Sequence, residues 1–343
     1  MPSCKVQATQ LVGFCALVFE GSEKKAEIVV SPAGFGDFEN LRFWPQSRWE
    51  KIVEASNARI LSKISTDELD AYLLSESSLF VWEDRFCIIT CGQTTLAHAV
   101  VEFFNFCDPK HVESLIFERK NEYFPEEQHS DFIADVDLLE KYLDGKAYQF
   151  GSIDGNHLFL YHLEKNYIPH KSDVTIEILM YGLQGEAKQL FNSHDQTRDQ
   201  LRQLSGVDQI LPGFDVDDFL FEPCGYSLNA VKGNEYYTIH VTPQDTCPYV
   251  SFETNAQIHH NYLPVIEKVV QTFQPTNFDV VVFRSGKQEF MCFENYQITN
   301  AVKYKLQCGY DVNYCQFTTT QIVKPLTPIQ KSKLAEKINP SSN

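Results

Sequence analysis

The sequence predicts an α+β protein with largely antiparallel sheets, and three observations support this fold class. Segments with the composition and periodicity of strands outnumber helical ones and follow one another in runs, whereas a doubly wound fold alternates strands with helices. Asp154-Gly155 separates two of these segments, and that dipeptide is a strong signal for a hairpin between antiparallel strands. No glycine-rich phosphate loop follows a strand-like segment, so a dinucleotide or P-loop site is not expected.

From the N-terminus, the apolar run 11–19 predicts a buried first strand. Charged residues follow it without the small-residue cleavage pattern of a signal peptide. Ser47 and Glu50 form a capping-box pattern that predicts a short helix to about Ala55. The next strand-like segment is 79–90, and Ser130 is the expected cap of a helix whose apolar residues repeat at helical spacing.

Later elements follow the same two periodicities. Strand-like segments occupy 148–153, 157–163, 175–180, 236–242 and 278–283, and apolar residues at helical spacing predict a helix over Leu263–Phe273. We expect one domain over 19–324, an N-terminal extension over 1–18 and a polar tail over 325–343.

Two similar hairpins indicate an internal duplication, with halves at about 19–165 and 166–324. Ser77 precedes Cys91 by 14 residues, and Ser227 precedes His240 by 13. Each hairpin would then present a hydroxyl on one strand and a thiol or an imidazole on its partner.

The composition restricts the function classes. The 343-residue chain has 29 Lys+Arg against 46 Asp+Glu, a formal net charge of −17, which argues against nucleic acid or an anionic membrane as a partner. With 43% hydrophobic and 22% charged residues it is typical of a globular protein. No apolar run approaches the roughly 18–20 residues of a membrane span. The ten cysteines include no CxxC pair, so we expect reduced thiols, a cytoplasmic location and no metal site.

Four segments contain residue types that support chemistry, although each by itself is typical of ordinary structure. Ser75–Ser78 would usually be a turn between apolar strands, and Cys91 a buried thiol at a strand end. Phe221–Ser227 would be a loop punctuated by proline and glycine. His240, within an apolar strand, is more often a core residue than a catalyst.

Together these segments resemble the eukaryotic-type S-adenosylmethionine decarboxylases, the pyruvoyl enzymes of polyamine biosynthesis. The resemblance covers about residues 19–317 and implies a four-layer α/β/β/α sandwich, in which two antiparallel sheets face each other with helices outside. It rests on six motifs that occur in the family's order: Phe19-Glu20-Gly21-x-Glu23-Lys24, Tyr72-x-Leu74-Ser75-Glu76-Ser77-Ser78, Thr90-Cys91-Gly92, Pro223-Cys224-Gly225-Tyr226-Ser227-x-Asn229, Thr238-Ile239-His240-Val241-Thr242-Pro243 and Tyr249-Val250-Ser251-Phe252-Glu253.

The resemblance implies a proenzyme that cleaves itself between Glu76 and Ser77. Ser77 would become a pyruvoyl group, which forms a Schiff base with the substrate and takes up electrons as CO₂ leaves, so neither pyridoxal phosphate nor a metal is implied. His240 matches the base of the processing reaction, and Ser227 matches the hydroxyl that assists it. Cys91 matches the donor that protonates the product carbanion. The implied reaction converts S-adenosyl-L-methionine to decarboxylated S-adenosylmethionine for spermidine and spermine biosynthesis.

The resemblance also implies a set of substrate-binding residues. Phe19 and Phe221 match the aromatic pair that sandwiches the adenine, and the backbone of Glu76 would hold the adenine edge. Glu20 and Glu23 match carboxylates that line the site, where they can neutralise a cationic substrate.

Two positions depart from the family pattern. Gln244 stands where the family usually has a glutamate that binds both ribose hydroxyls, and a neutral amide makes weaker hydrogen bonds. Lys25 stands where members activated by putrescine have an apolar residue, whereas members that dispense with putrescine have a basic one. The family's putrescine-binding acidic cluster is matched by Glu27, Asp173, Thr175, Glu177 and Glu253. A built-in ammonium in that pocket predicts weak or absent putrescine activation, and a Lys25 side chain that faces solvent would have no such effect.

Three alternatives remain open from the sequence. A pyruvoyl decarboxylase of a different amino acid is motivated by Gln244 only. A non-catalytic regulatory paralogue would lack the cleavable serine or its helpers, yet Ser77, Cys91, Ser227 and His240 are all present. A cysteine hydrolase built on Cys91 and His240 would need an oxyanion loop that the sequence does not suggest. The family includes monomers and dimers, so the sequence leaves a homodimer open.

Overall fold

The computed structural model describes residues 19–192, 196–244, 246–258, 262–286, 293 and 295–319. Within this part of the chain, sixteen strands form two antiparallel sheets of eight strands each, which confirms the predicted α+β fold class. The predicted strand over 11–19 lies outside the described residues except for Phe19, which is not in a strand, and the polar tail lies outside them. No described helix is long and apolar enough to cross a membrane.

The first sheet is built from the N-terminal half of the chain. Its strands are β1 (Lys24–Val30), β2 (Ile60–Ser65), β3 (Asp70–Leu74), β4 (Ser77–Val81), β5 (Arg85–Thr90), β6 (Val112–Lys120), β7 (Gly145–Gly151) and β8 (His157–Leu163). They lie in the order β2-β3-β4-β5-β1-β6-β8-β7. The segment predicted as one strand over 79–90 contributes to two strands, because a turn separates β4 from β5 and Trp82 N donates to Arg85 O over 2.9 Å.

The second sheet repeats this arrangement. Its strands are β9 (Val174–Leu183), β10 (Asp215–Leu220), β11 (Tyr226–Lys232), β12 (Glu235–Thr242), β13 (Tyr249–Thr254), β14 (Pro275–Arg284), β15 (Tyr296–Lys305) and β16 (Asp311–Thr319). Their order, β10-β11-β12-β13-β9-β14-β16-β15, matches that of the first sheet position by position. The strand β4, which begins with Ser77, corresponds to β12, whereas Ser227 lies on β11. The two hairpins are therefore not equivalent as expected: the one with Ser227 and His240 lies one strand away from the position that corresponds to Ser77 and Cys91.

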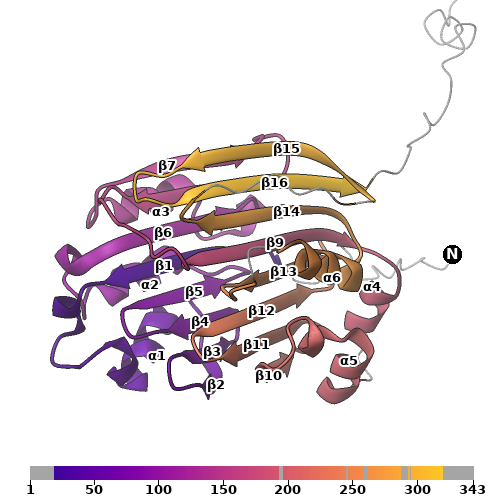
Figure 1. Ribbon diagram of the computed structural model, residues 1–343, viewed down its shortest axis with the longest axis horizontal. Helices are drawn as coiled ribbons and strands as arrows, with labels where there is room; N and C mark the ends of the chain where they lie inside the picture. Colours follow the sequence, from indigo (N-terminus) through magenta and orange to yellow (C-terminus); the bar gives the residue numbers. More distant parts are fainter. Residues whose placement is uncertain are drawn as a thin grey trace, which may run out of the picture.

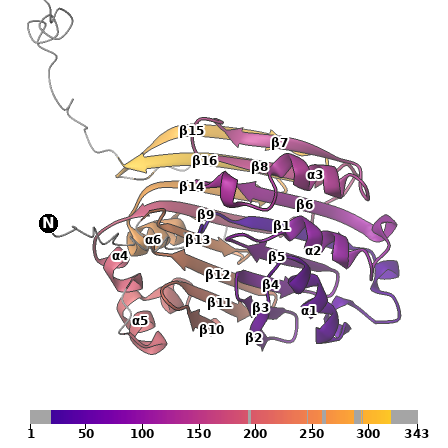
Figure 2. The same ribbon diagram turned by 180° about the vertical axis from the view of Figure 1, so that it is seen from behind.

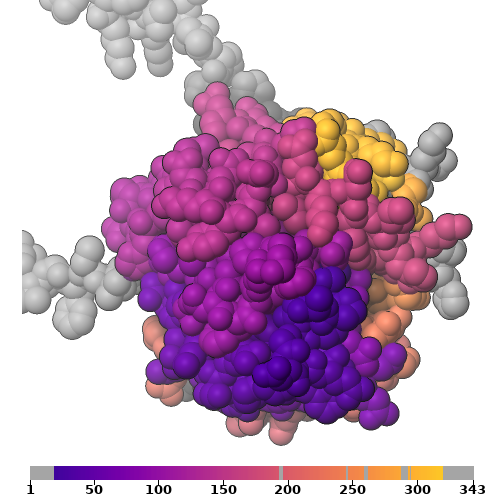
Figure 3. All heavy atoms as spheres, turned by 90° about the vertical axis from the view of Figure 1, so that its left-hand side faces the viewer, coloured from indigo at the N-terminus to yellow at the C-terminus, as the bar shows by residue number. Residues whose placement is uncertain are grey.

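Helices cover the outer faces of both sheets. The first sheet carries α1 (Gln46–Ala55), α2 (Leu96–Phe103) and α3 (Phe132–Leu139), and the second carries α4 (Gly185–Phe191), α5 (Arg198–Ser205) and α6 (Leu263–Phe273) (Figures 1 and 2). Short 3₁₀ helices occupy Pro32–Phe35, Leu41–Phe43, Pro109–His111, Pro125–Glu127 and Val207–Gln209. This is the four-layer sandwich that the resemblance implied. In the end-on view of Figure 3, the N-terminal half fills most of the visible face.

Two helix starts differ from the sequence prediction. The cap of α1 is Pro45, without a side-chain hydrogen bond, so Ser47 lies inside the first turn and does not cap it. The cap of α3 is Asp131, which accepts from Ala134 N over 2.8 Å. Ser130 instead donates to Asp135 over 2.6 Å. In both places a neighbouring residue provides the required backbone geometry, which the spacing of polar residues does not reveal.

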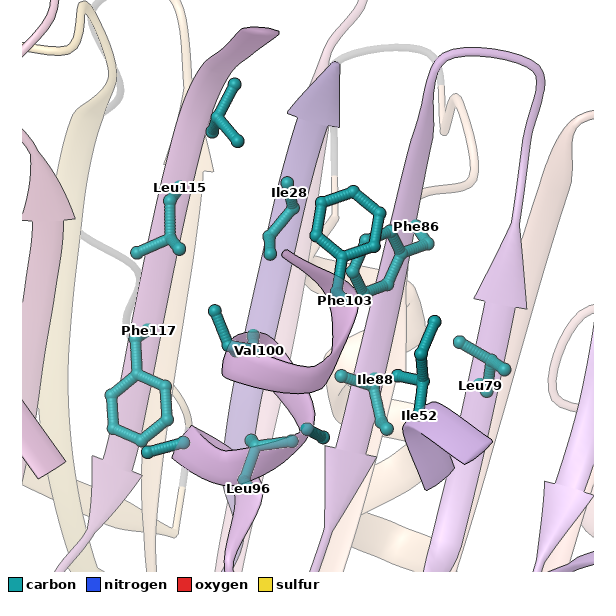
Figure 4. Close-up of a cluster of buried hydrophobic side chains, with 14 of the residues drawn as sticks. Ile28, Ile52, Leu79, Phe86, Ile88, Leu96, Val100, Phe103, Leu115 and Phe117 are labelled. Carbon is teal, nitrogen blue, oxygen red and sulfur yellow. The ribbon is translucent and has the colours of Figure 1, made fainter. Parts of the chain in front are cut away.

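Each sheet forms an apolar core with its own helices. Figure 4 shows the core of the first sheet, where Ile28, Ile88 and Leu115 from three strands contact Val100 and Phe103 of α2. These five side chains are at most 1% exposed. Because side chains alternate along a strand, the residues between these positions point to the opposite sheet, and many of them are polar.

Candidate active site

The turn between β3 and β4 holds Ser77 in a strained conformation. Leu74 pairs with Ser77, so only Ser75 and Glu76 form the turn. Ser75 is fixed because its N–H donates to Arg59 O over 2.9 Å and its Oγ accepts from Arg59 N over 3.0 Å. The φ angle of Ser77 is +137°, which crowds the Cβ and costs on the order of 1–3 kcal/mol. The buried Ser77 hydroxyl has no hydrogen-bond partner among the described residues.

The carbonyl group of Glu76 accepts two hydrogen bonds from Cys91. Its oxygen is 3.0 Å from the backbone nitrogen of Cys91 and 3.4 Å from the Sγ. Two donors on one carbonyl oxygen would stabilise the negative charge that develops when a nucleophile attacks the carbon. The loop after Cys91 requires Gly92, whose φ angle is +65° and whose hydrogen faces Phe19: an added Cβ would lie 2.6 Å from Phe19 Cε2.

The imidazole of His240 reaches the site from the second sheet. His240 on β12 pairs with Ser227 on β11, and its Nδ1 is 2.9 Å from Ser227 Oγ. Its Nε2 is 2.9 Å from Thr238 Oγ1 and 3.2 Å from Ser78 Oγ. Burial lowers the pKa of His240 to about 3, so the ring is neutral at pH 7 and able to accept a proton.

A cavity of about 230 Å³ brings these groups together. Its walls come from both sheets and their loops, and they include the following residues predicted from the sequence: Phe19, Glu76, Ser77, Cys91, Phe221, Ser227, His240 and Gln244. A nucleophile, a thiol, an imidazole and two aromatic rings, far apart in the sequence, therefore line one space.

Glu20 lies beside this cavity rather than in its wall. It lines an adjoining cavity of about 490 Å³ that shares two residues with the first. Its carboxylate accepts from two backbone N–H groups and from Gln128 Nε2, the last over 3.3 Å. Gln128 Oε1 accepts from Lys24 Nζ over 2.9 Å, and Lys24 also donates to Gly92 O over 3.0 Å. Neither Lys24 nor Gln128 was assigned a role from the sequence, although Lys24 ends the first of the six motifs.

Burial determines the protonation of the acidic groups near the cavity. It raises the pKa of Glu23, which accepts a hydrogen bond from Ser251, to about 8. It also raises the pKa of Glu76 to about 7. Burial, with Glu76 and Glu23 nearby, raises the pKa of the Cys91 thiol well above its ordinary value. The thiol thus keeps its proton at neutral pH.

Gln244 fixes the backbone of Phe19. Its Oε1 accepts from Phe19 N over 3.0 Å, and the Sγ of Cys247 is 3.8 Å from Phe19 O. Because the oxygen of the Gln244 amide is already engaged, its NH₂ group is the part available to a ligand in the cavity. Cys247 was not predicted as a site residue, and its sequence context gives no signal for this contact.

The predicted acidic cluster divides into two groups, each with its own cation. In one, Lys25 Nζ is 2.6 Å from Glu177, 3.0 Å from Glu253 and 3.7 Å from Glu118. Burial by itself would lower the pKa of Lys25, but these carboxylates raise it well above its ordinary value. Lys25 is only 5% exposed, so the alternative in which it faces solvent is wrong.

In the other group, the cation is Arg85. Its Nη1 is 2.9 Å from Asp173 and 3.5 Å from Glu27. These residues and Thr175 line a separate cavity of about 240 Å³. Sequence reasoning missed Arg85 and also Glu118, which pairs with Lys25 across β1 and β6. Both contacts depend on strand order and on the facing of the two sheets, which local sequence patterns do not encode.

The two facing antiparallel sheets and their outer helices form an α/β/β/α sandwich. A serine, a thiol and an imidazole line one cavity in it, which is the arrangement of an enzyme. No group of three or more His, Cys, Asp or Glu side chains among the described residues could hold a metal ion. The family model for adenosylmethionine decarboxylase matches residues 16–319. The chain belongs to this family, which confirms the family and the decarboxylase class predicted from the sequence.

Individual relatives agree with this assignment. The chain is 34% identical over 327 residues to the S-adenosylmethionine decarboxylase proenzyme of Dictyostelium discoideum, which covers 87% of this chain and 86% of the relative. It is 36% identical over 288 residues to that of Drosophila melanogaster, covering 77% and 82%. A crystal structure of the Trypanosoma brucei AdoMetDC-delta26 monomer superposes with a TM-score of 0.56 at 28% identity, over 70% of this chain and 98% of that one.

Proposed function

We propose that this chain is a proenzyme that cleaves itself between Glu76 and Ser77 and then decarboxylates S-adenosyl-L-methionine to S-adenosylmethioninamine and CO₂. The observation that carries the proposal is the geometry around one peptide bond. Ser77 has a φ angle of +137° and an unpartnered hydroxyl, and Cys91 donates twice to the Glu76 carbonyl. The designation of the relatives as proenzymes supports it.

Cleavage would begin at the Ser77 hydroxyl. Its oxygen attacks the carbonyl carbon of Glu76, and the N–H and thiol of Cys91 stabilise the resulting negative oxygen. The C–N bond between residues 76 and 77 breaks, the hydroxyl proton passes to the departing nitrogen, and an ester remains. Breaking this bond releases the backbone strain at Ser77, which favours the ester.

A second step would divide the chain. The carbonyl group of residue 77 acidifies its Cα proton, the ester makes the oxygen on Cβ a leaving group, and the neutral imidazole of His240, with Ser227 at its Nδ1, accepts that proton. The Cβ–O bond breaks, and Glu76 leaves as a C-terminal carboxylate. The dehydroalanine at position 77 becomes an imine, and water then releases ammonia and leaves a pyruvoyl group.

The residues around position 77 fit such a group. Ser77 lies in the wall of the same cavity as Phe19 and Phe221, so a ketone formed there borders the space available to a nucleoside. Such a ketone would supply an electrophile for the substrate amine and a sink for the electrons left when CO₂ departs. Cys91 would return a proton to carbon, because the thiol remains protonated at neutral pH.

The rest of the substrate has candidate partners in the same walls. The rings of Phe19 and Phe221 would stack on the adenine, whose edge would meet the backbone of Glu76. Glu20, in the wall of the adjoining cavity, would favour the sulfonium cation, and Glu23, whose pKa burial raises to about 8, would do so after losing its proton.

Lys25 would replace an activating diamine. Its Nζ already contacts Glu177 and Glu253, so putrescine would have to displace a covalently attached ammonium. We therefore expect weak or absent activation, and a several-fold rise in turnover with putrescine would contradict this part of the proposal. The homodimer stays a prediction, which sedimentation of the purified protein would test.

The intact mass of the purified protein under denaturing conditions tests the central proposal. We expect two chains, residues 1–76 and 77–343, the second blocked by a pyruvoyl group. Ser77→Ala should give one whole chain, whereas the matched control Ser65→Ala, at an exposed serine on β2, should be cut normally. A whole wild-type chain would contradict the proposal and favour a regulatory paralogue. A cut chain that releases CO₂ from another amino acid but not from S-adenosyl-L-methionine would favour the other decarboxylase.

A further inference from the structure

A buried polar network next to His240 has no role in the cleavage steps described above. Its centre is Asn229 on β11, which is 0% exposed. The Oδ1 of Asn229 accepts from Ser78 Oγ over 2.7 Å and from Thr238 Oγ1 over 2.9 Å. The same two hydroxyl oxygens lie 3.2 Å and 2.9 Å from His240 Nε2. The network therefore joins a strand of the first sheet to two strands of the second.

The direction of these hydrogen bonds follows from the orientation of the Asn229 amide, whose oxygen faces both hydroxyls while its Nδ2 has no partner among the described residues, and from the number of protons. A hydroxyl group donates one proton and accepts through its lone pairs. Ser78 donates to Asn229, and Thr238 has two acceptors for its proton, Asn229 Oδ1 and, at 3.0 Å, Leu228 O. The hydroxyls of Ser78 and Thr238 therefore face the ring of His240 with lone pairs. These lone pairs accept a hydrogen bond from Nε2, so Nε2 carries the ring proton. In a neutral imidazole the other nitrogen is then without a proton.

We propose that Asn229 is a positioning residue that acts through Ser78 and Thr238 to hold His240 as its Nε2–H tautomer, which makes Nδ1 the atom that receives the proton during chain cleavage. This inference rests on the proposed function and deepens it. The Ser77 Cα proton passes to Ser227 Oγ while the hydroxyl proton of Ser227 passes to Nδ1. The imidazolium that results has both N–H groups paired, Nδ1 with Ser227 and Nε2 with Thr238.

The tautomer can be measured directly by ¹⁵N NMR of the full-length chain. Ser77→Ala keeps the chain whole, and labelling with ¹⁵N-histidine reports on both ring nitrogens. The signals of His240 are those that disappear when His240→Gln is added. We expect a protonated Nε2 and a bare Nδ1. A proton on Nδ1 would overturn the inference, and this measurement does not require a variant of Asn229 to fold.

A pair of variants tests whether Asn229 sets the tautomer. Asn229→Leu releases the Ser78 proton, which can turn to Nε2 and favour the opposite tautomer, so cleavage should slow by about a hundredfold. Adding Ser78→Ala removes this competing donor and leaves Thr238, bonded to Leu228 O, as the acceptor for Nε2–H. The double variant should regain about tenfold of the rate.

The double variant separates positioning from simple packing. If Asn229 acted only by filling space, losing a second buried contact would slow cleavage further. A double variant that cleaves no faster than Asn229→Leu would therefore overturn the inference. Failure of the proposed function is recognised separately, because His240→Gln would then cleave at the wild-type rate.

Discussion

The outer cores of the sandwich are apolar, whereas the space between its sheets combines apolar clusters with buried polar and charged groups. Phe86 and Phe103 in the first core, and Ile266 and Phe278 in the second, are apolar and 0% exposed. Between the sheets, apolar clusters lie beside polar groups that are at most 5% exposed, among them Lys25, Glu118, Glu177, Asn229 and His240. The same strands contribute to both regions, because their side chains alternate between the two faces.

This contrast explains how the fold can support unfavourable chemistry. Burying a charged or polar group in the protein interior is costly unless it is paired. The two apolar cores supply the stability that offsets this cost. Burial then shifts the pKa values that the proposed mechanism uses, downward for His240 and upward for Cys91. We therefore expect substitutions in the outer cores to change stability alone, whereas substitutions between the sheets change activity or the dependence of stability on ligands and pH.

The largest effects are expected from Cys91→Ala, between the sheets, and Phe103→Ala, in the first outer core. Cys91→Ala removes the proposed proton donor and should lower decarboxylation per cleaved molecule by about 10²- to 10⁴-fold. Phe103→Ala should leave the rate per folded molecule near the wild-type value but lower the free energy of unfolding by about 3–5 kcal/mol. CO₂ release normalised to pyruvoyl content, together with urea denaturation, measures both. Equal losses of activity in the two variants would break the comparison.

The same contrast explains what the sequence could and could not predict. The apolar face of α6 and the largely apolar run of β8 are local patterns, and both elements occur where they were expected. Ser77, Cys91 and His240 stand in short motifs, so a resemblance could identify them, and the structure places them around one cavity. The pairing of Lys25 with Glu118 depends on β1 lying beside β6, and the role of Asn229 depends on the facing of two sheets. Such long-range contacts leave no local pattern.

Lys25→Met should have the next largest effect. The variant leaves Glu118, Glu177 and Glu253 close together without the cation that now contacts all three. Removing one partner from a buried ion cluster typically costs about 3–5 kcal/mol, and urea denaturation would show this loss. Putrescine should restore part of the stability of Lys25→Met while leaving the wild type almost unchanged. If putrescine stabilises both proteins equally, Lys25 does not replace a diamine.

We expect the free energy of unfolding to depend on pH because His240 is buried. The apolar side chains of the outer cores do not titrate and cannot cause such a dependence. The pKa of His240 is about 3 when folded against 6.5 for the ordinary group, so the unfolded chain binds the proton first as the pH falls. The stabilising contribution is complete above pH 6.5 and is lost as the pH falls from 6.5 toward 3. Between pH 7 and 5 the loss should be about 2 kcal/mol.

Urea denaturation at the two pH values checks this expectation in the uncut Ser77→Ala chain. Relative to that chain, the one with His240→Gln added should be more stable at pH 5 by about 2 kcal/mol once the two are compared with their stabilities at pH 7. The subtraction is needed because Glu23 and Glu76, whose pKa values are raised by burial, act in the opposite direction. An identical pH dependence in both chains would show that His240 is not buried as a neutral ring.

Gln244→Glu should have the smallest effect. It distinguishes two roles of Gln244 in the cavity, the binding of the ribose and the fixing of Phe19. A carboxylate at this position can still accept from Phe19 N, as the amide oxygen does now over 3.0 Å. Its second oxygen would replace the NH₂ group and accept from the ribose as a charged group. Hydrogen bonds to charged groups are stronger by about 1 kcal/mol, which corresponds to about a fivefold lower KM at unchanged kcat. Gln244→Leu, which removes the acceptor for Phe19 as well, should raise KM instead. If KM stays constant in Gln244→Glu but rises in Gln244→Leu, Gln244 supports substrate binding only by holding Phe19, and the ribose is bound elsewhere.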